Sequence, residues 1–175
     1  MATVILRPDS IESSTGFDVS GATLLGRIND SDPDTGVTQS QTTANITGAF
    51  DNSEDYSGAT ITQVQMTVQA STSGRAEECT ITCDLLDGEG EILQRDIHSF
   101  TAENESRVGT AVTSGLNRSG IDDLQFTLSA SSDGCIIKEV SIEVTFTVAT
   151  PAGNPAYILL NSGKYKITAG KVKIL

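Results

Sequence analysis

Alternation of apolar and polar residues dominates the middle of this chain. In VQMTVQA, residues 64–70, every second side chain is apolar, and the residues between them are glutamine or threonine. The same period of two continues in CTITCDLL, residues 79–86, and later in residues 124–130 and 135–148. Because successive side chains of a strand point to opposite faces, each segment is predicted to be a strand with one buried face.

The first 60 residues carry a weaker version of this pattern. ATVILR, residues 2–7, is predicted as a strand that ends at Pro8. Residues 24–28 are predicted as a short strand, and the polar residues 29–41 as a long loop. Another short strand is predicted over residues 45–50.

Turn residues separate these segments every eight to twelve positions. Asp87, Gly88 and Gly90 predict a hairpin between residues 79–86 and the segment EILQRDI that follows. Serine and threonine together number 41, and helix-forming residues never collect into a long run. We therefore predict an all-β protein, an antiparallel β-sandwich of the jelly-roll type with a short C-terminal β-meander.

Residues 151–175 differ in charge from everything before them. They contain four lysines and no acidic residue, whereas the first 150 residues hold all 23 acidic side chains and seven of the 11 basic ones. The net charge of the first part is therefore −16 (7 minus 23), and that of the tail is +4. With Pro151 and Pro155 as a hinge, we predict a body over residues 1–150 and a docking extension over 151–175.

Within the tail, the segments YILL, KYKI and KVKIL are predicted to be short strands, and in the last two lysine alternates with apolar residues. So small a sheet buries too little surface to be stable alone and must pack against something. It can dock on another protein, pack on a copy of itself, or complete the sheet of the acidic body with its own strands. The predicted interaction residues are Tyr157, Leu159, Lys164, Tyr165, Lys166, Ile167, Lys171, Val172, Lys173, Ile174 and Leu175.

The three cysteines show no metal-ligand spacing. Cys79 and Cys83 share one face of a strand but lie about 13 Å apart, too far to form a disulfide. We expect buried thiols, with pairing of Cys135 to one of the others across a sheet as the alternative. The N-terminus lacks a signal-peptide pattern, so we expect synthesis in the cytoplasm, where disulfides are rare.

The charge of the chain limits its partners. The isoelectric point is near 4.3, so duplex nucleic acid and anionic membranes would be repelled. No stretch approaches the length of about 18 apolar residues that spans a membrane. We therefore expect neither a nucleic-acid nor a membrane partner.

Candidate catalytic residues are few. The only histidine, His98, shares a strand face with Asp96, but Ser99 points to the other face, so these three residues do not form a triad. The carboxylate pairs at residues 77–78 and 122–123 are adjacent and diverge in extended structure. We therefore expect a non-enzymatic protein without a cofactor, with His98 at a strand edge or an interface.

One loop has the composition of a calcium site. Asp30, Asp32 and Asp34 alternate and can supply hard oxygen ligands. However, Gly36 comes one position later than an EF-hand loop requires, and Gln41 stands where a bidentate glutamate is needed. These aspartates are weak candidates for Ca²⁺, and a polar turn is the alternative.

Residues 45–148 resemble known jelly-roll modules. The succession ATITQVQMTVQASTSG, TITCDLLDGEGEIL and IDDLQFTLSASSDGCIIKEVSIEVTF resembles those of bacteriophage virion proteins and of carbohydrate-binding modules. The near repeat of GKYKI and GKVKI in the tail also resembles phage head and tail accessory proteins.

This resemblance implies a non-enzymatic capsid decoration or cement protein, made in the host cytoplasm and located in the virion. Its partners would be the major capsid protein or other virion proteins, and it would form a homo-oligomer, with a trimer favoured. One alternative is a phage tail, fibre or head-knob component. Another is a carbohydrate-binding module, for which Tyr56 is the only tyrosine of the body that can serve as a sugar platform.

Overall fold

A computed structural model describes most of the chain. The described residues are 1–17, 21–29, 35–50, 59–72, 78–101, 105–114, 123–131, 134–148, 156–160, 163–168 and 171–174, with backbone alone for 21–23 and the last three ranges. The elements are β1 (Ala2–Leu6), β2 (Pro8–Thr15), α1 (Gly21–Ile28), β3 (Val37–Thr38), β4 (Ala44–Phe50), β5 (Ala59–Thr72), β6 (Cys79–Leu86), β7 (Ile92–Phe100), β8 (Glu105–Val108), β9 (Gln125–Ala130), β10 (Cys135–Val148), β11 (Ala156–Leu160), β12 (Gly163–Thr168) and β13 (Lys171–Ile174).

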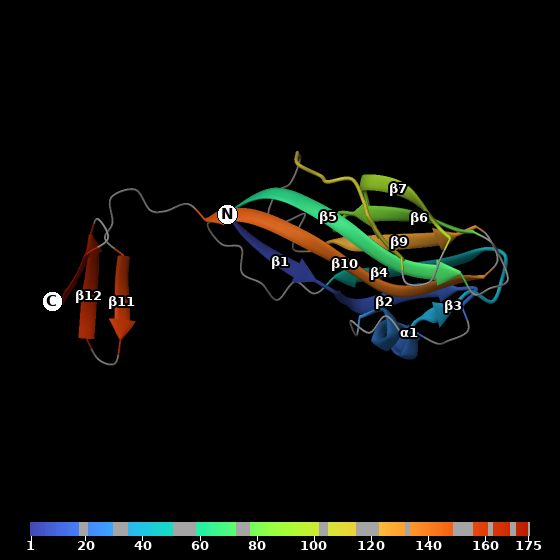
Figure 1. The fold of residues 1–175 in the computed structure, drawn as a ribbon, viewed down its shortest axis with the longest axis horizontal. Helices are drawn as coiled ribbons and strands as arrows, with labels where there is room; N and C mark the ends of the chain where they lie inside the picture. Colours follow the sequence, from blue (N-terminus) through green and yellow to red (C-terminus); the bar gives the residue numbers. More distant parts are fainter. Residues whose placement is uncertain are drawn as a thin grey trace.

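Two five-stranded sheets form the body. Sheet A has the order β1-β10-β5-β8, with β3 paired to β10, and sheet B has the order β2-β4-β9-β6-β7. Neighbouring strands run antiparallel in both sheets. Figure 1 shows the long strands β5 and β10 crossing in front of sheet B. The predicted jelly-roll-like antiparallel β-sandwich is therefore confirmed.

The alternating segments form the core between the sheets, as predicted. On β5 the inward residues Val64, Met66 and Val68 are buried, and the glutamines between them are only partly covered. The core of sheet B contains Ile81 of β6 and Phe126 of β9. The prediction fails at the end of β10, where the register shifts after Thr145: Thr145 is buried, Phe146 is only partly buried and residue 148 is 63% exposed.

The predicted strand over residues 24–28 is wrong, because this segment belongs to helix α1. Leu24 and Ile28 lie one helical turn apart and are both fully buried. The helix packs beside β2 and β10 (Figure 1). The same apolar spacing of four fits one face of a strand or of a helix, so local pattern could not decide between them.

Strand β2 was missed by the sequence prediction, which ended the first strand at Pro8 and left the next residues irregular. The chain crosses from sheet A to sheet B at Arg7, and β2 then pairs with β4 at the edge of sheet B. Its register shifts twice, and most of its side chains are exposed. An irregular edge strand lacks the clean alternation that a half-buried strand shows.

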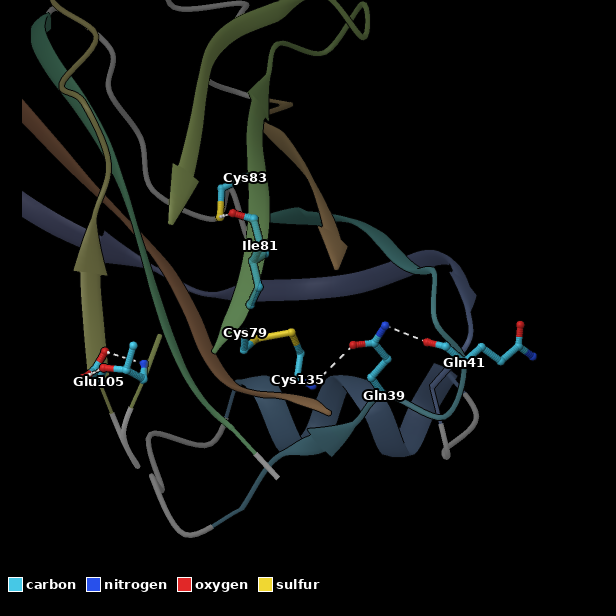
Figure 2. The surroundings of a disulfide bond; sticks show 8 residues. Gln39, Gln41, Cys79, Ile81, Cys83, Glu105 and Cys135 are labelled. Carbon is cyan, nitrogen blue, oxygen red and sulfur yellow. Dashed lines mark hydrogen bonds between the residues drawn. A yellow bond between two sulfur atoms is a disulfide. The ribbon is translucent and has the colours of Figure 1, made fainter. Parts of the chain in front are cut away.

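A disulfide joins the two sheets, which corrects the expectation of three buried thiols. Cys79 on β6 is bonded to Cys135 on β10, with 5.2 Å between the Cα atoms, and both residues are fully buried (Figure 2). Cys83 is the free, buried thiol. The alternative of a bond across the sandwich is the one found, because the fold brings together strand ends separated by 56 residues.

Buried Gln39 holds the chain next to this disulfide. The backbone N–H of Gln39 donates to the Cys135 carbonyl at 2.8 Å, and its side-chain Oε1 accepts from the backbone N–H of Cys135 at 3.3 Å. Its Nε2 donates to the carbonyl of Gln41 at 2.6 Å (Figure 2). The polar side chain is therefore satisfied inside the core, as burial requires.

The C-terminal strands form a third sheet with the order β11-β12-β13, drawn apart from the sandwich in Figure 1. None of these three strands pairs with a strand of sheet A or sheet B in the described part of the chain. The register pairs Lys166 with Lys173, and it pairs Ile167 with Val172. The three predicted strands are thus confirmed, and the register of β12 and β13 places their lysines on one face and their apolar residues on the other. On β11, Tyr157 and Leu159 pair with Lys166 and Lys164, so the lysine face is not purely cationic. The boundary at residue 150 stays a prediction.

Candidate functional site

A row of polar residues crosses the outer face of sheet B from edge to edge. Neighbouring strands pair Ser13 with Thr47, Thr47 with Thr127, Thr127 with Asp84, and Asp84 with Arg95. We call these five residues the polar row. On the three inner strands β4, β9 and β6, the residues on either side of the row are buried in the core, so the row faces away from it.

A fixed ion pair occupies one end of this row. Arg95 Nε donates to Asp84 Oδ1 at 2.6 Å, and Nη2 donates to Oδ2 at 2.7 Å. The Asp84 side chain is 11% exposed, whereas that of Arg95 is 56% exposed and covers it. Hydrogen bonding to Asp84 raises the pKa of Arg95 above its ordinary value. The two-pronged contact fixes the plane of the guanidinium and leaves the N–H groups on Nη1 out of the pair.

Hydroxyl groups continue the row beyond this pair. The Oγ1 atoms of Thr47 and Thr127 are 3.3 Å apart and share a hydrogen bond. Thr82 and Ser129 pair in the next row of the same face, and both are half-buried. Short hydroxyl side chains have little rotamer freedom to lose, so a ligand would order this face at low entropic cost.

The polar row is long enough for an extended ligand. Five strands about 4.8 Å apart span about 19 Å across the sheet. Along this line, carboxylate, guanidinium and hydroxyl groups offer both hydrogen-bond donors and acceptors. The geometry suits a chain of polar rings better than a single small ion.

A second polar cluster lies where the edge strands β7 and β8 meet. Thr110 donates to Asp96 through its N–H at 2.9 Å and through its hydroxyl at 2.8 Å. Burial lowers the pKa of His98, Asp96 opposes this effect, and Arg107 lowers the pKa further. Asp96 and His98 share the inward face of edge strand β7, and Ser99 lies on the other face, as predicted. These three residues therefore do not form a catalytic triad.

Several predicted site residues cannot be placed. The calcium candidates Asp30, Asp32 and Asp34 and the sugar-platform candidate Tyr56 lie outside the described residues. Within the described ranges, no three histidine, cysteine or acidic side chains gather as a metal site. Nor does that part of the chain contain a helix long and apolar enough to cross a membrane.

The sequence prediction missed the polar row because the row depends on long-range register. Thr47 and Thr127 are 80 positions apart, and each looks like an ordinary outward position of its own strand. Asp84 and Arg95 are different, because the hairpin turn at residues 87–90 sets their register. That turn was the one local signal from which part of the row could have been found.

The chain was compared with known proteins. No protein-family model matches it, and neither does any curated protein. The C-terminal CBM6 of LamC, a marine laminarinase from Zobellia galactanivorans, is similar with a TM-score of 0.47 and 13% identity, over 82% of this chain and 99% of that one. CBM6cm-2 from Cellvibrio mixtus lichenase 5A, in complex with cellotriose, has a TM-score of 0.43 and 9% identity, over 82% and 97%. CBM32 of AlyQ, in complex with 4,5-unsaturated mannuronic acid, has a TM-score of 0.45 and 18% identity, over 78% of this chain and 96% of that one.

The prediction of a bacteriophage virion protein, in particular a capsid decoration or cement protein, is wrong. The similar structures are mostly carbohydrate-binding modules of the CBM6, CBM35 and CBM32 types. A phage protein among them, the enzymatically active domain of tailspike protein 4 of bacteriophage CBA120, reaches a TM-score of only 0.35 at 14% identity, over 85% of this chain and 19% of that one. The error arose because a jelly-roll strand pattern is shared by proteins of many functions.

Proposed function

We propose that the sandwich is a non-catalytic binding module for a carbohydrate chain, which lies along the polar row on the outer face of sheet B. The observation that carries this proposal is the Asp84–Arg95 pair, held in two-pronged geometry at the end of a row of hydroxyl groups. This arrangement is polar, flat and fixed before any ligand arrives.

The chemistry of the row matches that of a sugar. Each hydroxyl of a sugar can donate and accept a hydrogen bond, so a row of hydroxyl groups that ends in a guanidinium can contact several hydroxyls at once. Hydrogen bonds to charged groups are the stronger ones, and the ion pair supplies such groups without mobile side chains. Preorganisation of this kind lowers the entropic cost of binding.

The same residues support a binding role rather than a catalytic one. Both oxygens of Asp84 accept from Arg95, and both oxygens of Asp96 accept from Thr110. Because donors within the protein already engage these oxygens, neither carboxylate is positioned to exchange a proton with a substrate. Binding without turnover is therefore the role we assign to the sandwich.

A glycan array probed with the full chain, followed by calorimetric titration of the strongest ligand, tests this function. Thr127→Val removes one hydroxyl from the row while keeping the side-chain shape. It should weaken binding about three- to tenfold, as expected for one lost hydrogen bond. The matched control is Thr67→Val, on the outer face of sheet A, which should leave affinity unchanged. Absence of any glycan ligand, or equal effects of the two variants, would show the proposal to be wrong.

A further inference from the structure

The edge strands of the sandwich differ in how they are protected against pairing with another strand. An unpaired edge presents free backbone N–H and C=O groups and invites an additional strand. On β7, the Ser99 carbonyl accepts from Arg107 Nε at 3.2 Å, and the Arg95 carbonyl accepts from Gln94 Nε2 at 3.1 Å. Side chains therefore occupy acceptors of the β7 edge.

The edges formed by β2 and β8 are protected in other ways. β2 begins with Pro8, carries Glu12 and contains two register shifts. β8 has only four residues, and two of them, Glu105 and Arg107, form an ion pair at 2.6 Å. Proline, charge, irregular register and short length are the usual devices against edge pairing.

β1 is one residue longer than β8 and lacks the proline, the charges and the irregular register that protect the other edges. Its five residues, ATVIL, contain no proline and no charge, and its register with β10 is regular. Among the described residues it pairs with β10 alone, so its other edge lacks a strand partner there. Ile5 on this strand is 59% exposed. β1 is thus a flat, apolar edge that is ready to accept a strand.

We propose that this edge of β1 binds β13 from the C-terminal sheet of a second copy of the chain, so that the third sheet extends sheet A of its neighbour. Such strand addition gains its affinity from main-chain hydrogen bonds and its specificity from alternate side chains. The donor is chosen because it is the strand with lysines at alternate positions at one edge of the third sheet.

Charge complementarity supports this choice of partner. The tail carries +4, and the first 150 residues carry −16 (7 minus 23). Glu143 is exposed on the outer face of sheet A, directly beside Ile5 of β1. With the lysine face of β13 on that side, the added strand would lie two strand spacings, about 10 Å, from β10 and its Glu143. That separation is comparable to the screening distance at moderate salt. The apolar face of β13 then continues the inner face formed by Val4 and Leu6.

The chain's own tail is close to this edge but does not fill it. Ala2 pairs with Phe146, so β1 begins beside the end of β10, which leads into the tail. Even so, β11, β12 and β13 pair only with one another in the described part of the chain. Two copies can exchange tails reciprocally. Alternatively, three copies can form a closed ring in which each tail binds the next copy, which would be the trimer expected from the sequence analysis.

Sedimentation velocity of the full chain over a wide range of concentrations tests the association. Ile5→Lys places a cation against the lysine face and should weaken association about two- to fivefold, whereas Ile5→Glu should strengthen it by a similar factor. The matched control is Ile97→Lys, an equally exposed isoleucine on edge strand β7, which is 68% exposed. A monomer at every concentration, or equal effects of Ile5→Lys and Ile97→Lys, overturns the proposal.

Engineered cysteines test the contact itself. A chain with Val4→Cys, on the inner face of β1, is mixed with a chain with Val172→Cys, on the apolar face of β13, and oxidation should give a cross-linked pair that contains one of each. In the proposed arrangement both positions lie on the same face of adjacent strands, where disulfide geometry can be reached. Cross-linking no faster than between Ser129→Cys and Val172→Cys, which lie on surfaces not expected to meet, counts against strand addition at β1.

Discussion

Removal of the disulfide between the sheets should cost about as much stability as a large hydrophobic substitution in the core. The perturbation is the double variant Cys79→Ala and Cys135→Ala. The bond closes a loop with a sequence separation of 56. For a loop of this length, the chain-entropy relation gives about 4 kcal/mol of stabilisation at 25 °C. That is a large share of the 5 to 15 kcal/mol that is typical of a whole domain.

The assay is thermal and urea unfolding of the oxidised protein, the reduced protein and the variant. A loss of about 4 kcal/mol lowers the melting temperature by about 8 to 16 °C for a chain of this size. Cys83→Ala is the matched control, because it removes a buried thiol without removing a cross-link. It should cost only about 1 kcal/mol, as expected for deletion of one small apolar group.

Two results would refute this reasoning. One is three free thiols in the native protein, measured by mass after alkylation in denaturant. The other is a double variant no less stable than Cys83→Ala, which would mean that the cross-link constrains the unfolded chain little. Slow reduction of the native protein would fit the full burial of both sulfurs, because a reductant reaches them only when the sheets separate.

Two further predictions concern single buried side chains. Burial, together with the nearby Asp96 and Asp84, raises the pKa of Cys83 from 9.0 to about 12. The thiol of the unfolded chain therefore loses its proton at lower pH than the buried thiol does. The free energy of unfolding should fall as the pH rises from about 9 to about 12. The loss is about 1.4 kcal/mol per pH unit at most, and alkaline urea titrations of Cys83→Ala should lack it; identical pH slopes would contradict the assignment. Leu24→Ala should destabilise the protein by about 2 to 5 kcal/mol in urea unfolding because Leu24 anchors α1 in the core, whereas the partly exposed Leu25 should matter much less.

The sequence predicted those strands whose burial follows from local alternation. Val64, Met66 and Val68 lie on one face because successive side chains of a strand point in opposite directions, whatever the neighbouring strand is. The turn at Gly90, which has a φ of 84°, fixed the β6–β7 hairpin in the same local way. Both depend only on residues close together in the chain, so both could be found without the fold.

Features that depend on distant partners could not be predicted in this way. Cys79 and Cys135 meet only after the two sheets have packed, and the sequence near either residue does not indicate which cysteine it pairs with. Helix α1 exists because Leu24 and Ile28 fill a space beside β2 and β10, although their spacing also fits a strand. For such ambiguous segments, tertiary packing decides whether a helix or a strand forms, and it can override the local propensity.

The two proposals concern different surfaces, so both interactions can form on the same molecule at once. The polar row lies on the outer face of sheet B, whereas the accepting edge of β1 belongs to sheet A, so strand addition at β1 leaves the row accessible. A row without a stacking aromatic among its five residues relies on hydrogen bonds, each of which contributes only about 1 kcal/mol net. An assembly of two or three copies presents as many rows to one carbohydrate chain, and the effective concentration of the second row raises avidity without any new contact. Self-association would thus make a weak, hydrogen-bonded face useful as a binding surface.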